Sequence, residues 1–152
     1  MSDERRPSFA SALSYRDPKA ALIWLEKAFG FEPAMVILGP DGELAHSEMT
    51  FGNGLIMVGN EWHGDTKSPA SIGGTNTQSV HIHIDTDIDA HCERARKAGA
   101  EIIMEPENQF YGDRTYRAKD PEGHIWSIGQ TVEVMTRDDW AKAGGVTVRD
   151  RL

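Results

Sequence analysis

The feature that most constrains this chain is a spacing repeated between its two halves. Gly30 and Gly99, which end two helix-like segments, lie 69 residues apart. The turn glycines Gly54 and Gly123 show the same separation of 69 residues. Turn glycines are common, but a spacing shared by two kinds of structural marker predicts an internal duplication.

Each half predicts the same order of elements: a strand, a helix and three further strands. Apolar residues alternate with small or polar ones in the strand segments, and two capping residues 70 positions apart, Asp17 and Asp87, open the helices. The first half has expected strands at 9–15, 31–38, 44–51 and 55–58. The second has them at 80–84, 101–104 and on either side of the turn at 120–123. The sequence therefore predicts an α+β fold of two tandem βαβββ modules.

A single domain of residues 8–131 accommodates both modules. Module one is expected at 8–58 and module two at 79–131, with a linker at 59–78 that is rich in Gly, Ser and Thr and has no periodicity. A loop of that length in a compact domain is usually functional or disordered. Residues 132–152 are expected to form a C-terminal tail with a short helix that opens at Thr136.

Composition narrows the class of partner. The formal charge is −8, from 16 basic and 24 acidic residues, which disfavours nucleic acid and anionic membranes as partners. No apolar run approaches the roughly 20 residues of a membrane span, and the polar start predicts no secretory signal. One cysteine, Cys92, excludes an internal disulfide framework and favours a cytoplasmic location. The expected partner is a small molecule or another protein.

The segment from Tyr111 to Ile128 contains a strand, an Asp-Pro-x-Gly turn and a second strand. This arrangement resembles the end of a module in the vicinal oxygen chelate superfamily, which includes glyoxalases, bleomycin-resistance proteins and extradiol dioxygenases. The aromatic-Gly-Asp-Arg run at 111–114 is similar to an uncharacterised branch of that group. The resemblance covers residues 8–131. It implies that the modules pair curved mixed sheets around a shared ligand-binding cup and that the protein is a homodimer.

Metal-dependent members of that superfamily place His, Gln or Glu at four positions in the first and last strands of each module. The resemblance maps these positions to Ala10, Val58, Ser127 and either Ser79 or Val80. None of these residues is an ordinary ligand of a first-row metal. We therefore expect no metal at the family position and no cofactor.

Other polar residues are candidates for the lining of the cup. In two strand segments the histidines alternate with apolar residues, which assigns them to the face opposite the helices. The repeat mates of His46 and Glu48, at 69 residues further along, are Thr115 and Arg117. The alternative is a set of ordinary polar residues on a solvated sheet face. The residues expected to share one concave surface are His46, Glu48, His81, His83, Arg117 and Ser127.

Three candidates lie in loops. Trp62, in the linker beside His63, is expected to fold over the opening and add an aromatic contact. Tyr111 and Arg114 precede the last hairpin, where Arg114 either reaches a ligand or forms a structural pair with Asp113. His124, which shares the parity of the apolar side of its strand, is expected to be structural.

Three functions remain open from the sequence. The first is a metal-independent binder of a small amphipathic molecule, with Arg117 favouring an anionic group on it. The second is a lyase, isomerase or dioxygenase-like enzyme that uses an unorthodox His/Glu site. The third is an interaction or structural dimer with a vestigial cup. The sequence does not decide between an enzyme and a binder, and it assigns no catalytic residue.

Overall fold

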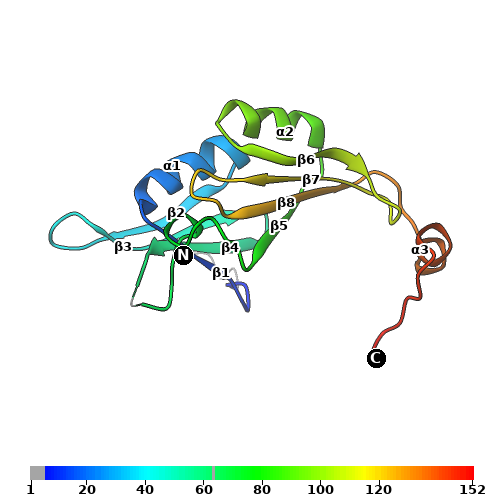
Figure 1. Ribbon diagram of the computed structural model, residues 1–152, viewed down its shortest axis with the longest axis horizontal. Helices are drawn as coiled ribbons and strands as arrows, with labels where there is room; N and C mark the ends of the chain where they lie inside the picture. Colours follow the sequence, from blue (N-terminus) through cyan, green and yellow to red (C-terminus); the bar gives the residue numbers. More distant parts are fainter. Residues whose placement is uncertain (1–5, 63) are drawn as a thin grey trace.

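The computed structural model describes residues 6–62 and 64–152, and it contains two four-stranded mixed sheets with a helix on each (Figure 1). Module one comprises β1 (Ser11–Tyr15), α1 (Pro18–Phe29), β2 (Glu32–Leu38), β3 (Leu44–Phe51) and β4 (Gly54–Asn60). Module two comprises β5 (Ser79–His83), α2 (Ile88–Lys97), β6 (Glu101–Asn108), β7 (Asp113–Lys119) and β8 (Ile125–Thr131). The predicted α+β fold of two βαβββ modules is confirmed.

The two sheets have the same topology. Their strand orders are β1-β4-β3-β2 and β5-β8-β7-β6, and in each the first and last strands of the module pair in parallel while the other pairs are antiparallel. Both helices lie on one side of the sheets, as Figure 1 shows, and the opposite faces stay open. The sheets are therefore not closed within one chain, which is consistent with the fold that the resemblance implies.

The repeat offset changes within each module. Met49 and Ala118 face the helices at equivalent positions 69 residues apart, whereas their hairpin partners Ile56 and Trp126 are 70 apart. The cause is the last turn of module two: five residues lie between the paired Lys119 and Ile125, and four lie between the equivalent pair Thr50 and Leu55. The predicted mate of Ser127 at Val58 is therefore wrong: Val58 is 1% exposed in the core, and Met57 occupies the equivalent place.

The core lies between the helices and the sheets and joins the two modules. Phe29 and Phe31 of module one lie against Trp126 of module two, with ring centroids 5.3 and 5.5 Å apart. Cys92 is buried in this core as expected. Aromatic contacts of this kind across the module boundary make one continuous apolar core.

The helices also cap one another. The side chain of Arg94 on α2 donates to the carbonyls of Lys27 (2.9 Å) and Glu26 (3.0 Å) in the last turn of α1, where helix carbonyls lack a full set of partners within the helix. In return the indole of Trp24 on α1 donates to the carbonyl of Ala98 at the end of α2 (2.7 Å). Each module thereby completes the hydrogen bonding of the other.

Two expected elements differ in extent. Strand β6 continues to Asn108, beyond the predicted end at Met104, with register shifts along its pairing to β7. Pro106 is compatible with the longer strand because β6 is at a sheet edge, where a missing backbone donor is tolerated. The linker, in turn, contains a short 3₁₀ turn, Pro69–Ser71.

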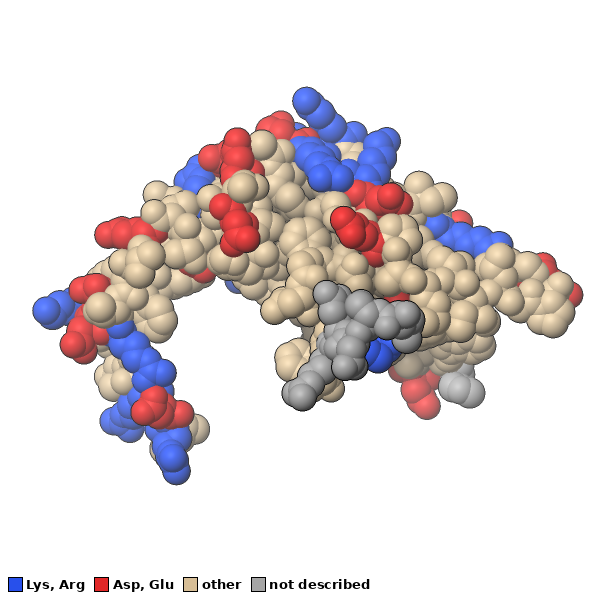
Figure 2. Space-filling model, turned by 180° about the vertical axis from the view of Figure 1, so that it is seen from behind, with Lys and Arg blue, Asp and Glu red and all other residues tan. Residues whose placement is uncertain are grey.

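The C-terminal tail leaves module two as an arm. Helix α3 (Arg137–Gly144) opens with the predicted capping box between Thr136 and Asp139 and lies apart from the sheets in Figure 1. Figure 2, from behind, shows the same arm separated from the body by a hollow and carrying charges of both signs. Within the described residues, no helix is long and apolar enough to cross a membrane.

Candidate functional site

One line of polar side chains crosses the open face of sheet two. His81 on β5, Ser127 on β8 and Arg117 on β7 are partners in register. The imidazole Nδ1 of His81 lies 3.0 Å from the Ser127 hydroxyl, and Arg117 is exposed. The predicted alternation is therefore correct for these three residues: they lie opposite the helix-facing Val80, Ile82 and Ile128.

Gly129 makes room for His81. A Cβ built on Gly129 would lie 3.1 Å from the imidazole Cε1, so a larger residue would force the ring to move. Burial lowers the pKa of His81, and the nearby His83 lowers it further, while Asp113 acts in the opposite direction. His81 is therefore neutral at pH 7 and able to donate or accept a hydrogen bond.

His83 lies one step further along the same face. Its Nε2 is 3.1 Å from the Thr131 hydroxyl, which donates in turn to Asp113 at 2.9 Å. The hydroxyl is thus a donor to the carboxylate and an acceptor from the histidine. This arrangement fixes the ring of His83 on the open face beside His81.

Sheet one carries a second polar group at the equivalent position. Glu48 is the repeat mate of Arg117. Its partners in register on the neighbouring strands are Met35 on β2 and Met57 on β4. Its Oε2 lies 2.9 Å from His46 Nε2, and Arg6 Nη2 donates to both carboxylate oxygens at 3.0 and 2.9 Å. These contacts lower the pKa of Glu48, with the hydrogen bond from Arg6 the largest cause, so the carboxylate is ionised at neutral pH.

Arg6 was not predicted as a site residue. It lies in a polar N-terminal segment without periodicity. Its partner Glu48 is 42 residues further along the chain, and only folding brings the two side chains together. Among the described residues, no hydrogen bond or ion pair joins the His46–Glu48 pair with the His81–Ser127 pair. The two pairs lie on different sheets: His46 and Glu48 on β3 of sheet one, and His81 and Ser127 on β5 and β8 of sheet two.

A groove of about 870 Å³ lies where β1 and β5 approach each other. Its walls come from the start of β1, the β3–β4 turn and β5, and include Phe9, Phe31, Phe51, His81 and His83. The volume is within the range of small-molecule sites, and aromatic walls with a few polar groups are usual for them. The aromatic members of this lining were not predicted, because phenylalanines in strand segments look like ordinary core residues.

The loop candidates have different positions. Arg114 donates to Asp89 (3.0 Å) and Asn108 (3.1 Å), and it shares the helix-facing parity of Tyr116 and Ala118. The expected Asp113–Arg114 pair is therefore wrong, and Arg114 lies on the face opposite Arg117. The reason is that its partner Asp89 comes from α2, which strand alternation alone does not locate.

Trp62 and Tyr111 are both partly exposed. A Cβ built on Gly59 would lie 3.4 Å from the indole nitrogen of Trp62, so the Trp62 ring lies beside the end of β4. Tyr111 stacks edge-on against Phe110 at 5.2 Å, near the tail, where a Cβ on Gly144 would clash with the Phe110 ring. His63 lies outside the described residues.

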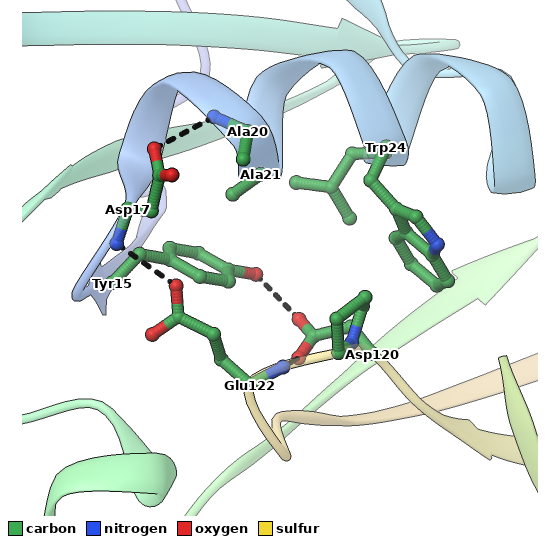
Figure 3. A pocket seen from close by; sticks show the side chains of 9 residues that line it. Tyr15, Asp17, Ala20, Ala21, Trp24, Asp120 and Glu122 are labelled. Carbon is green, nitrogen blue, oxygen red and sulfur yellow. Dashed lines mark hydrogen bonds between the residues drawn. The ribbon is translucent and has the colours of Figure 1, made fainter. Parts of the chain in front are cut away.

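A second, smaller cavity of about 140 Å³ lies under α1 (Figure 3). Its lining includes Tyr15, Trp24 and the carboxylates of Asp17, Asp120 and Glu122. Every one of these carboxylates accepts protein hydrogen bonds: Asp17 caps α1, Asp120 accepts from Tyr15, and Glu122 accepts from the backbone of Arg16 and Asp17. The cavity is part of the structural connection between the last turn and β1.

His124 belongs to the same connection. Its Nε2 donates to the Ser14 carbonyl at 2.8 Å, and its ring lies against Tyr15 with centroids 4.6 Å apart. The expected structural role of His124 is supported by these contacts. No cluster of three or more His, Cys, Asp or Glu that could hold a metal occurs in the part of the chain that the structure describes.

Residues 9–128 match the Glyoxalase/Bleomycin resistance protein/Dioxygenase superfamily. The chain belongs to this superfamily. An uncharacterised protein of Mycobacterium bovis is 33% identical over 137 residues, which cover 88% of this chain and 89% of that one. An uncharacterised protein of Mycobacterium tuberculosis has the same identity, with 79% of its length covered.

Solved structures of the glyoxalase and bleomycin-resistance superfamily have the same fold. TioX from Micromonospora sp. ML1 is 30% identical, with a TM-score of 0.67 over 82% of this chain and 98% of that one. TnmS3, an antibiotic binding protein from Streptomyces sp. CB03234, is 18% identical, with a TM-score of 0.62 over 84% and 99%. The resemblance inferred from the Asp-Pro-x-Gly hairpin is therefore confirmed.

Proposed function

We propose that this protein binds a small amphipathic molecule on the open faces of its sheets and that binding needs no metal. The observation that carries the proposal is the line of His81, Ser127 and Arg117 across an open sheet face, beside a groove with aromatic walls. An exposed arginine in the same row as a neutral imidazole, with Ser127 between them, favours an anionic group on the ligand. TnmS3, which has the same fold, is an antibiotic binding protein, and this supports a small molecule as the ligand.

The residues at the family's metal positions do not fit a metal ion. The longer turn of module two assigns the position in β4 to Met57. The position in β5 is Ser79, because Val80 has the helix-facing parity. The four residues, Ala10, Met57, Ser79 and Ser127, have no imidazole or carboxylate, which are the usual donors for first-row metals. No step of the proposed function passes through a metal.

We propose further that the protein is a cytoplasmic homodimer. The open faces support this, because sheet one presents Glu48 and sheet two presents Arg117 at equivalent positions. Sheet one of one copy facing sheet two of another would bring opposite charges together and enclose the ligand. Sedimentation velocity at high micromolar concentration tests this, and a monomer there would contradict it.

The aromatic sulfonate 8-anilinonaphthalene-1-sulfonate is a suitable probe for the binding site. We expect saturable binding to the folded protein, weaker by about tenfold in Arg117→Ala, because a hydrogen bond to a charged group contributes about 1.5–3 kcal/mol. His81→Ala is expected to weaken it as well. Arg149→Ala, in the tail, makes the same change of charge away from the sheet and should bind as wild type. Unchanged affinity in both sheet variants would overturn the proposal.

A second candidate function is an enzyme, and the His46–Glu48 contact of 2.9 Å favours it. An imidazole paired with an ionised carboxylate is a usual general base. Equilibration with zinc, nickel, manganese or ferrous iron followed by elemental analysis separates a metal-dependent enzyme from the metal-independent binder. The binder is expected to retain less than one metal per chain. One metal per chain, lost in His46→Ala or His81→Ala, would favour the enzyme.

A further inference from the structure

The contact between Arg6 and Glu48 has the form of a ligand contact made by the protein itself. Glu48 is only 5% exposed, and it lies on the open face of sheet one. The guanidinium group on it comes from residues 6–9, an exposed segment that precedes β1. Arg6 has a side chain that is 63% exposed, so the cation rests on the carboxylate from the solvent side.

The surroundings of Glu48 suit a cation attached to an apolar body. Met35 on β2 and Met57 on β4 are its partners in register, so a thioether side chain lies on either side of the carboxylate. Methionine side chains are polarizable and adapt to ligands of different shape. His46 contacts the same carboxylate oxygen, Oε2, as one of the two contacts from Arg6.

We propose that Glu48 is the subsite for a guanidinium, amidinium or amine group of the ligand, and that Arg6 occupies this subsite until such a group displaces it. The inference rests on the proposed function, because it assigns a ligand chemistry to one of the two open faces. It makes sheet one the cation-binding face and sheet two, through Arg117, the anion-binding face.

Arg6 is an easily displaced occupant. One nitrogen, Nη2, makes both contacts, so the pair lacks the two parallel bonds of a forked arginine–carboxylate pair. Ion pairs with an exposed partner are weak, because solvent screens the charges and the long side chain loses freedom when it is held in place. Occupancy of that strength lowers the apparent affinity of a competing cation by about two- to sixfold.

Benzamidine, an aromatic amidinium, is the probe, and benzamide is its neutral counterpart. Calorimetric titration should show benzamidine binding about two- to sixfold tighter in Arg6→Gln than in the wild type. Glu48→Gln is expected to abolish binding in both backgrounds. Arg149→Gln, the matched loss of charge in the tail, should bind as wild type, and benzamide should show no dependence on Arg6.

Two outcomes would overturn the inference: equal benzamidine affinity in the wild type and Arg6→Gln, or benzamidine binding that survives in the Arg6→Gln, Glu48→Gln double variant. The aromatic sulfonate titrated into the same variants keeps the two proposals distinct. If the affinity for the sulfonate still depends on Arg117 while the affinity for benzamidine is unchanged by Arg6→Gln, only the proposal of a cation subsite is overturned. If neither probe binds, the proposed function fails as well.

Discussion

Asp120 accepts four hydrogen bonds although its side chain is almost wholly buried. Oδ2 accepts from the Tyr15 hydroxyl (2.6 Å) and the Trp126 indole (3.1 Å), and Oδ1 accepts from the backbone of Glu122 and His124. Burial, followed by the nearby Asp120 charge, raises the pKa of Tyr15 well above its ordinary value. The phenol therefore stays a donor at all ordinary pH values, and the turn stays attached to β1.

Asp120→Ala should lower the free energy of unfolding by at least about 3 kcal/mol, because it leaves three buried donors, the Tyr15 hydroxyl, the Trp126 indole and the His124 backbone N–H, without partners. Tyr15→Phe removes one of the four bonds and should cost about 1 kcal/mol. Urea unfolding of both variants measures the difference. Equal losses would contradict the account of Asp120 as a shared acceptor.

His91 is a half-buried group whose partners define its state. Its Nε2 lies 2.9 Å from the Phe29 carbonyl, which only accepts, so this nitrogen carries the proton and Nδ1 accepts from the Tyr116 hydroxyl at 2.6 Å. Burial lowers the pKa of His91, the bond to Phe29 opposes this, and Arg94 lowers the pKa further.

The lowered pKa of His91 predicts a loss of stability in acid. Between pH 7 and pH 5 the unfolded chain, with an ordinary histidine pKa of about 6.5, takes up a proton that the folded chain resists. The free energy of unfolding should therefore fall as the pH falls. His91→Gln should show a smaller fall over the same range in urea titrations. His81, whose pKa is also lowered, contributes equally to both proteins, so identical pH dependences would count against this role of His91.

Gly112 determines how the tail joins module two. It has φ +94°, and a Cβ there would lie 2.1 Å from the carbonyl oxygen of Glu133. Its own carbonyl accepts from the backbone of Val132 and Glu133 at 2.9 and 3.0 Å. The glycine is required twice, once for its backbone angle and once for the close approach of the chain that leads to α3.

Gly112→Ala should lower the free energy of unfolding by at least about 2 kcal/mol more than Gly42→Ala. Gly42 has a similar φ of +77°, but a Cβ there would have no neighbour within 4 Å. The pair thus separates backbone strain from the clash with Glu133. Chemical unfolding gives the two values, and similar losses would show that the tail adapts without cost.

The strands and helices were predictable because they depend on short-range pattern. Alternation in 80–84 correctly assigned His81 and His83 to the open face, and the caps Asp17 and Asp87 both accept from the backbone three residues on. What failed depends on distant partners or on turn length. Val58 was misplaced by one extra residue in a turn of the other module.

The site was less predictable for the same reason. Arg114 lies in a strand whose alternation is clear, yet its carboxylate partner is Asp89 on a helix 25 residues away. Arg6 has no pattern around it at all. Long side chains reach across elements, so the sequence locates their backbone and leaves their contacts open.

The connections between the modules predict how the protein unfolds. The last turn of module two holds the start of α1 through Glu122, whose carboxylate accepts from the backbone of Arg16 (2.7 Å) and Asp17 (3.0 Å). The same carboxylate accepts from Ser68 in the linker at 2.6 Å. Helix caps in both directions and a shared aromatic core reinforce this connection. If one module unfolds, the helix end and the part of the core that it covers in the other module become exposed to water.

The two modules should therefore unfold together in one transition. Trp24 and Trp126 lie at the module boundary and report tertiary structure by fluorescence, while far-ultraviolet circular dichroism reports the helices and strands. In urea the two signals should give one midpoint and one slope. Glu122→Gln should lower that midpoint without separating the signals, because the helix caps and the aromatic core still join the modules. Two transitions in the unaltered protein would show that the halves kept their independence after duplication, despite the repeated contacts between them.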